Sequence, residues 1–169
     1  MSSEQLPELS HEEISKHFDN ARESIRRRFP KILHKQGDYL NRVINFVLED
    51  SYMHPHLHPS DEKIEKMYLL GGSFALVMFD DKGAITDTTV LEMGGLESID
   101  VPAFTWHTYV MLSKEVIIYE TMEGVYEPST WKKMAPWAVE ENTSEAADYL
   151  NKLKECVVGS DESIGTVSI

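Results

Sequence analysis

Three histidines and one glutamate are the residues of this chain best suited to metal chemistry: His56, His58, Glu65 and His107. His56 and His58 are two residues apart, and side chains at that spacing lie on one face of a β-strand. Imidazole nitrogens together with one carboxylate suit divalent first-row metals such as Fe, Mn, Ni, Cu and Zn. A metal held in this way keeps a net positive charge, so it can bind an oxygen ligand or activate water. Glu65 and His107 would have to come from other strands of a closed barrel to complete the site.

The histidine spacing also allows other interpretations. His54 has the same parity as His56 and His58, so the metal-binding pair could instead be His54 and His56. A third interpretation is a barrel whose histidines hold no metal. Spacing within this one segment does not choose between these alternatives.

The residues beside the other two candidates predict that they point into the core. Glu65 shares the strand parity of Met67, and His107 shares that of Met111, and both methionines are expected to be buried. Glu120 alternates with apolar residues in the same way. It is therefore either a carboxylate of the same site or a structural hydrogen-bond acceptor.

The apolar pattern between residues 43 and 122 predicts β-strands with no helix between them. The expected strands are 43–48, 52–58, 64–70, 74–79, 85–91, 106–112 and 116–122. Glycines at 71–72 and the Asp-Asp-Lys-Gly run at 80–83 mark turns. Short strands at such close intervals are typical of an antiparallel barrel or sandwich.

Helical periodicity is confined to the two ends of the chain. Ser10 and Glu13 have the spacing of a capping box, which predicts a helix over roughly 10–28 that ends at Phe29-Pro30. The run Arg26-Arg27-Arg28 would then be a solvated helix end or an anion site. A second helix is expected to start at 143 or 144 and to run through 154, whereas 1–9 and 159–169 are expected to be flexible. The predicted division is an N-terminal tail and helix at 1–38, a barrel at 39–142, and a C-terminal helix and tail at 143–169.

Composition argues against several classes of partner. The chain of 169 residues has 29 acidic and 16 basic side chains and a formal charge of −13, whereas nucleic acid and anionic membranes both require cationic surface. A single cysteine, Cys156, excludes an internal disulfide and fits a reducing compartment. The sequence has neither a signal-peptide pattern nor an apolar run of membrane-spanning length. We therefore expect a cytoplasmic protein that binds neither nucleic acid nor membrane.

The order of these motifs resembles the cupin superfamily. His-x-His is followed by Glu, by Gly seven residues later, and then by Pro-x-x-x-x-His at 102–107. The surrounding sequence is most similar to WbuC-type cupin-fold metalloproteins, over roughly residues 21–142. The similar stretches are 42–44, 51–58, 79–83, 101–107, 119–126 and 135–140.

The resemblance implies a mainly β, cupin-like jelly-roll barrel, with an N-terminal and a C-terminal helix, around one divalent transition metal (Fe, Mn, Ni or Zn). The implied ligands are His56, His58, Glu65 and His107. We assign Glu120 and Tyr109 as catalytic candidates. The remaining residues expected to line the pocket are Tyr52, Met67 and Tyr126.

The chain departs from the usual cupin pattern at several positions. Six residues separate His58 from Glu65, and Glu62 fits the shorter gap of most cupins, although only Glu65 lies seven residues before a glycine. Phe104 replaces the glycine of the usual Pro-x-Gly pattern. Met111 stands where many cupins have asparagine, and an aspartate at 50 stands where the first motif often opens with glycine.

These residues predict a metal-binding protein whose ligand is a small oxygen-rich molecule, such as a sugar or sugar nucleotide. The sugar expectation comes only from the association of WbuC-type proteins with O-antigen polysaccharide loci. An enzyme of this kind would be an isomerase or epimerase, or an iron oxygenase, with Glu120 or a pocket tyrosine as acid–base group. The alternative is a non-catalytic binding module in which the metal anchors the ligand. A homodimer is expected from the resemblance, and the sequence gives no role for His34.

Overall fold

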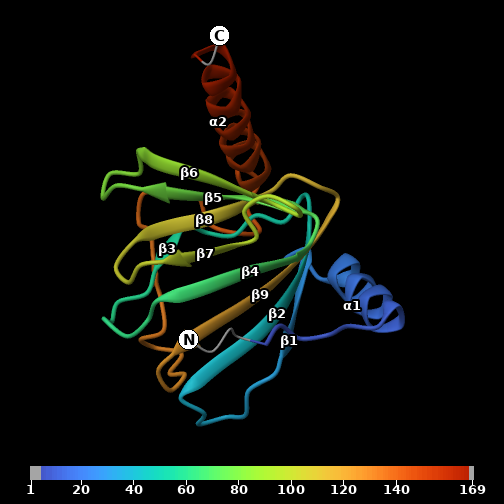
Figure 1. The fold of residues 1–169 in the computed structure, drawn as a ribbon. Coiled ribbons are helices and arrows are strands. Elements are labelled where there is room, and N and C mark those ends of the chain that lie inside the picture. Colours follow the sequence, from blue (N-terminus) through green and yellow to red (C-terminus); the bar gives the residue numbers. More distant parts are fainter. Residues whose placement is uncertain (1–4, 168–169) are drawn as a thin grey trace.

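Strand residues of alternating polarity build two antiparallel sheets that face each other in the computed structural model, which describes residues 5–167 (Figure 1). The first sheet has the order β1-β2-β9-β4-β7 and the second β10-β3-β8-β5-β6. The strands of the first sheet are β1 (Arg28–Ile32), β2 (Leu40–Leu48), β9 (Glu115–Glu123), β4 (Glu65–Gly71) and β7 (Ser98–Val101). Those of the second are β10 (Lys133–Met134), β3 (His56–Leu57), β8 (Trp106–Met111), β5 (Ser73–Phe79) and β6 (Ile85–Glu92).

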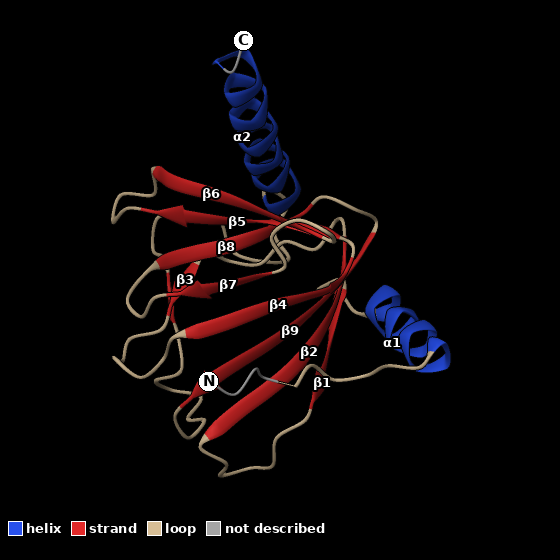
Figure 2. Cartoon of the chain, viewed as in Figure 1, coloured by secondary structure: helices blue, strands red, loops and turns tan. Residues whose placement is uncertain are grey.

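Both faces of each sheet are covered, which gives three apolar layers instead of one. The layer between the sheets contains Met67, Phe74, Leu76 and Ile118. It is formed by the alternate residues of each strand that point inward. Helix α1 (His11–Glu23) covers the outer face of the first sheet, and α2 (Ala146–Val167) covers part of the outer face of the second (Figure 2). Strand β8 is consequently buried along its whole length.

Helix α1 begins as the sequence predicts but ends five residues earlier. Ser10 and Glu13 form the capping box, with Glu13 N–H donating to Ser10 Oγ at 3.1 Å. The helix ends at Glu23, and Arg28 already belongs to strand β1, which pairs with β2. Pro30 disfavours helical backbone at the residue before it and is tolerated in β1, which is an edge strand. The arginine run is therefore not the last turn of the helix.

The strand predictions are right for the long strands, including the edge strand β6, and wrong for the short ones. Of the predicted strand 52–58, only His56–Leu57 pairs, because Pro55 and Pro59 have no N–H to donate to a ladder. Strands β1, β7 and β10 were not predicted. Each has two to five residues; β1 and β7 pair with the longer strands β2 and β4, and β10 pairs with the equally short β3.

The C-terminal helix is longer than the sequence indicates. It runs through Val167, so most of the segment 159–169 is helical, and 168–169 lie outside the described residues. Leu150, Leu153 and Val157 are buried against the second sheet. Beyond them the helix projects away from the sheets (Figure 1). At the other end, residues 5–10 precede α1 without regular structure, and 1–4 of the predicted tail lie outside the described residues. No helix among the described residues is long and apolar enough to cross a bilayer.

Gly72 forms the turn between β4 and β5, seven residues after Glu65. Its φ is +78°, and a Cβ on it would lie 2.4 Å from the carbonyl oxygen of Glu115. Only glycine fits this close approach, because it combines a left-handed backbone with the absence of a side chain. The tight turn fixes the register of β4, and with it the inward direction of Glu65.

Candidate metal centre

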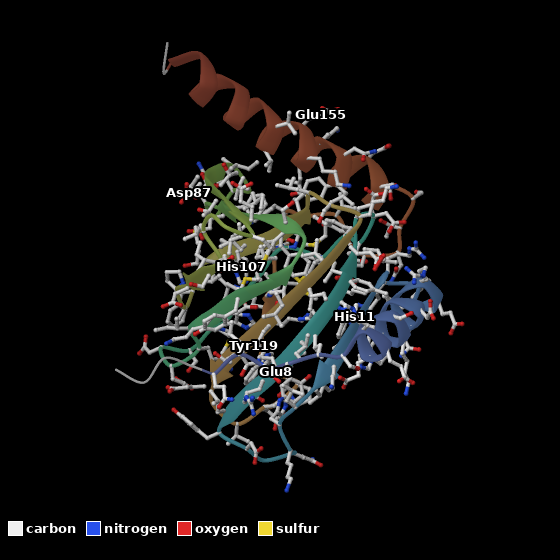
Figure 3. All side chains as sticks on the ribbon, turned by 45° about the vertical axis from the view of Figure 1, so that its right-hand side comes forward. Glu8, His11, Asp87, His107, Tyr119 and Glu155 are labelled. Atoms are coloured by element: carbon white, nitrogen blue, oxygen red, sulfur yellow. The ribbon has the colours of Figure 1, made fainter. Side chains whose placement is uncertain are left out.

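The structure brings His56, His58, Glu65 and His107 together between the two sheets. All four are buried, and one potential ligand atom from each lies within 4.8 Å of the others. His56 and His107 are directly opposite in the antiparallel pair β3–β8, and their ring centroids are 4.6 Å apart. Glu65 reaches them from β4 in the opposite sheet. Figure 3 shows His107 in the body of the sandwich, away from the labelled surface residues Asp87 and Glu155.

The three histidines are oriented by main-chain carbonyl groups. A carbonyl oxygen only accepts hydrogen bonds, so the Nδ1 atom that faces it must carry the proton. This leaves Nε2 of each ring directed toward the centre, which is the arrangement that metal-ligating histidines adopt. The Nδ1 contacts are His56 to His54 O (3.0 Å), His58 to Trp131 O (2.9 Å) and His107 to Thr105 O (2.8 Å).

Glu65 is the common neighbour of two of these rings. Its Oε2 lies 2.9 Å from His107 Nε2 and 3.2 Å from His58 Nε2. Two ligand atoms held at about 2.1 Å from one metal and at right angles to each other are about 3.0 Å apart. The spacing and the donor set therefore fit a divalent transition metal with Glu65 as its anionic ligand.

The charges of the cluster are shifted in the direction that metal binding requires. Burial lowers the pKa of His56 well below its ordinary value, which keeps this ring neutral. Burial by itself raises the pKa of Glu65. The hydrogen bonds and charge of His107 and His58 reverse this effect, so the pKa lies well below its ordinary value. A neutral imidazole and an ionised carboxylate are the forms that bind metal.

Glu120 lies beside the four ligands on β9, where it faces Met67 of β4. Burial, followed by the charge of Glu65, raises the pKa of Glu120 well above its ordinary value, and a hydrogen bond with Asn45 opposes this shift. Its Oε1 has no hydrogen-bond partner among the described residues. A buried carboxyl oxygen without a partner is costly unless something else contacts it, so this atom is free to meet a bound molecule.

A cavity of about 190 Å³ opens over the cluster and is lined by His56, His58, Glu65 and Glu120. Tyr109 also lines it, and burial raises the pKa of this phenol above its ordinary value. The remaining polar and aromatic residues of its wall are Arg26, Arg28, Asn41, Asn45, Thr121, Trp131 and Lys132.

The other residues assigned to the pocket lie outside this cavity. Tyr52 is on the outer face of the second sheet, where its hydroxyl donates to Val139 O and its ring meets Tyr149 of α2. Met67 belongs to the apolar layer between the sheets. Tyr126 is 51% exposed and packs on Trp131. Strand parity did not predict these positions, because Tyr52 and Tyr126 lie in irregular segments.

The alternative ligands are also placed by the structure. His54 faces the second sheet's outer layer, with Nε2 2.8 Å from Ala135 O, so it is not part of the cluster despite its parity. Glu62 is exposed and hydrogen-bonded to Ser60. His34 has a structural role, because its Nδ1 accepts the N–H of Arg42 at 3.0 Å.

Three cationic residues of the cavity wall were missed as site residues from the sequence. Arg26 and Arg28 were expected at a helix end, and Lys132 in an irregular segment with no assigned role. The only signal for the two arginines was the anion-site interpretation of the arginine run. No sequence pattern marked Lys132 as a site residue, because its position depends on how the segment 124–134 crosses the barrel.

Comparisons with known proteins support the fold. Residues 9–91 match the family model of a domain of unknown function, DUF6016. Comparison with curated proteins found no match. Among solved structures, the protein SO0799 from Shewanella oneidensis is 12% identical with a TM-score of 0.52, covering 66% of this chain and 75% of that one. CapF, solved with the inhibitor 3-isopropenyl-tropolone, is 14% identical with a TM-score of 0.53.

The CapF match covers 63% of this chain but only 34% of CapF. Oxalate decarboxylase from Bacillus subtilis, described as having Mn(II) centres, is 13% identical with a TM-score of 0.47, over 62% of this chain and 29% of that chain. SO0799 and CapF are cupin-fold proteins, so the predicted mainly β cupin-like fold with a helix at each end is confirmed. At this level of identity the likeness concerns the fold alone.

Phe104 marks a strained turn beside the histidines. It stands where most cupins have glycine, and its φ is +59°, a left-handed conformation that is unusual for a bulky residue. The turn lets Phe104 N–H donate to His58 O at 3.0 Å. The backbone at Phe104 therefore has the left-handed conformation that glycine adopts without cost. The Phe104 side chain makes this conformation unfavourable, and it is 56% exposed.

Replacing a ligand should abolish stoichiometric metal binding. We expect His56→Ala and His107→Ala to lose far more affinity than the roughly 10–100-fold that follows loss of an outer partner, because each removes a direct donor. His54→Gln is the matched control and should still bind one equivalent of metal. The measurement is elemental analysis of protein purified without metal-affinity resin. Full metal content in His56→Ala would refute the assignment.

Relieving the strained turn should stabilise the protein. Phe104→Gly removes about 1–2 kcal/mol of left-handed strain, while the freer unfolded chain costs about 0.5–1 kcal/mol, so the net gain is up to about 1.5 kcal/mol. Ala103→Gly, one residue earlier and without positive φ, should lose a similar amount. Urea unfolding measures both. A lower midpoint for Phe104→Gly would contradict the strain argument.

Proposed function

We propose that this chain is a WbuC-type cupin metalloprotein that holds one divalent transition metal (Fe, Mn, Ni or Zn) and acts on a small oxygen-rich molecule of sugar type. The observation that carries the proposal is the buried cluster His56, His58, Glu65 and His107 at the floor of a cavity, beside which Glu120 Oε1 has no hydrogen-bond partner among the described residues. The resemblance of the motif order to WbuC-type proteins supports the family assignment.

The volume of the cavity limits the size of the molecule. Pockets that enclose drug-sized ligands measure about 300–1,000 Å³, and this cavity is about 190 Å³. It has room for a molecule no larger than about one monosaccharide. If the substrate is a sugar nucleotide, its nucleotide part must lie outside the cavity.

The residues around the cavity have distinct roles in this proposal. The bound metal would act as a Lewis acid toward a carbonyl or hydroxyl oxygen of the substrate. Glu120 can transfer a proton, because it lines the cavity and its Oε1 has no hydrogen-bond partner among the described residues. Tyr109 stays protonated and can donate a hydrogen bond that orients the substrate.

An isomerase or epimerase uses these groups more fully than a binding module does. Anchoring a ligand to a metal needs no further acid or base, whereas proton transfer next to a carbonyl needs both a Lewis acid and a positioned carboxyl group. Glu120 therefore favours catalysis over simple binding. An iron-dependent oxygenase is the runner-up, since it would use the same four ligands and leave Glu120 without a role.

A homodimer is part of the same proposal. Cupin-like barrels commonly pair edge strands or exchange terminal segments. Here β6 and β7 are edge strands, and α2 projects beyond the sheets (Figure 1). These features support pairing between two copies of the chain.

Binding of an oxygen-rich molecule should change the surroundings of the metal. Protein loaded with Mn(II) should accelerate the relaxation of water protons, and a panel of aldoses, ketoses and their acids should contain compounds that reduce this effect at millimolar concentration. The reason is that substrate oxygens replace water near the four protein ligands. His107→Ala treated in the same way is the control. A panel without any effect would contradict the proposal.

Removing the acid–base group should separate catalysis from metal binding. Glu120→Gln should keep its metal but exchange the proton adjacent to a substrate carbonyl with deuterium about 10²–10⁴-fold more slowly. The control is Glu123→Gln, an exposed residue of the same strand. Deuterium incorporation followed by NMR measures the rate. Equal rates in the two variants would remove Glu120 from the mechanism and leave the binding module as the better description.

A further inference from the structure

The cavity is cationic in a strongly acidic chain. Three basic side chains line it, Arg26, Arg28 and Lys132, although the whole chain has a formal charge of −13. Its acidic lining residues are Glu65, which faces the histidines, and Glu120. With a divalent metal on the four ligands the cavity has a net positive charge even if Glu120 is ionised. Such a field attracts anions and repels cations.

Arg28 has a structural partner and does not need a ligand. Its guanidinium is buried and forms an ion pair with Glu141 Oε1 at 2.8 Å. It also donates to Ser51 Oγ and to the carbonyl oxygen of Tyr52. The residue therefore ties the start of β1 to the segment before β3. Its charge is largely balanced by Glu141.

Arg26 and Lys132 still have donors available. Arg26 uses only Nε, which donates to Glu141 Oε2 at 3.2 Å. Its two terminal nitrogens and the Nζ of Lys132 form no hydrogen bond or ion pair with any residue between 5 and 167. A partly buried ammonium group without a partner is unfavourable, so Lys132 is better explained by a group that binds there.

The chain holds Lys132 in place from both sides. The carbonyl oxygen of the preceding residue, Trp131, accepts the Nδ1–H of His58, and the Trp131 ring lies beneath the ammonium of Lys63 at 5.0 Å. Strand β10 begins at the following residue and pairs with β3. Lys132 thus comes from the second sheet's edge, whereas Arg26 precedes β1 of the first sheet. The two cations line the cavity from different sheets.

We propose that the molecule bound here is an oxyanion, whose carboxylate or phosphate group is held between Arg26 and Lys132 while its neutral oxygens face the His56–Glu65 end. A neutral sugar would leave the Lys132 ammonium and the terminal nitrogens of Arg26 without an anionic partner, whereas an anionic group accepts charge-assisted hydrogen bonds from each. The orientation toward the histidines rests on the proposed function. The anion clamp rests only on the cavity, on the Lys132 ammonium and on the two terminal nitrogens of Arg26, which have no partner among residues 5–167.

A matched set of three-carbon probes tests this assignment by calorimetry. Glycerol is neutral, glycerate carries a carboxylate, and glycerol 3-phosphate carries a phosphate. We expect metal-loaded protein to bind at least one of the two anions and to bind glycerol at least tenfold more weakly. Whichever anion binds identifies the oxyanion. Failure of both anions to bind, or equal binding of glycerol, overturns the proposal.

Variants identify the residues responsible. Lys132→Met and Arg26→Gln should each weaken anion binding about tenfold or more, the loss expected for one charged hydrogen bond. Lys133→Met and Arg27→Gln are the neighbouring controls, since Lys133 is exposed and Arg27 pairs with Asp50, and they should change affinity less than twofold. Lys132→Arg should retain the preference for anions. Unchanged binding in Lys132→Met would rule out the clamp.

Metal-free protein separates this inference from the proposed function. If the chain binds no metal but still binds an anion in a Lys132-dependent way, the clamp stands and the metalloprotein proposal fails. If the metal-loaded protein binds glycerol as tightly as the anions, the metal proposal stands and the clamp fails. Thermal unfolding of each variant confirms that it is folded. Lys132→Met should be at least as stable as the unmodified chain, because it removes an unpaired charge.

Discussion

The carboxylate of Glu65, buried against His58 and His107, is the interaction on which the site depends. A buried charge must be matched by partners in good geometry, and here each imidazole can offer Nε2 only because Nδ1 is already bound to a main-chain carbonyl. One of these carbonyls belongs to Trp131, far along the chain. Assembling the cluster therefore also draws the segment before β10 across the barrel and closes the cavity wall.

The layered packing explains how a sandwich of this size accommodates so much buried polarity. A polar cluster inside the only core of a small domain would remove much of its hydrophobic stabilisation. Here α1 seals the outer face of the first sheet with Phe18 and Ala21, and α2 seals that of the second with Leu150 and Leu153. The outer layers supply apolar burial, so one end of the inner layer can be polar.

The electrostatic pattern matters more for function than the fold does. Cupin-fold neighbours share the sandwich at 12–14% identity, and a shared fold does not specify a reaction. Specificity must come from the wall of the cavity, where Glu120 Oε1, the terminal nitrogens of Arg26 and the Lys132 ammonium have no partner among the described residues. The sequence-based expectation of a sugar or sugar nucleotide used Glu120 but neither Arg26 nor Lys132. The proposed oxyanion uses Arg26 and Lys132, and it narrows the substrate class without changing the metal chemistry.

The sequence by itself determined the inner faces of the central strands, and its resemblance to cupins pointed to the four residues that cluster between the sheets. Strand alternation is a local property, so the inward parity of Glu65, His107 and Glu120 could be read directly. Only the tertiary structure decided the positions of residues in segments without strand alternation. His54 turns outward despite its parity, the edge strands form because a neighbour lies beside them, and Lys132 reaches the cavity because Trp131 is bound to His58. The physical reason is that these positions are fixed by contacts between residues distant in the chain.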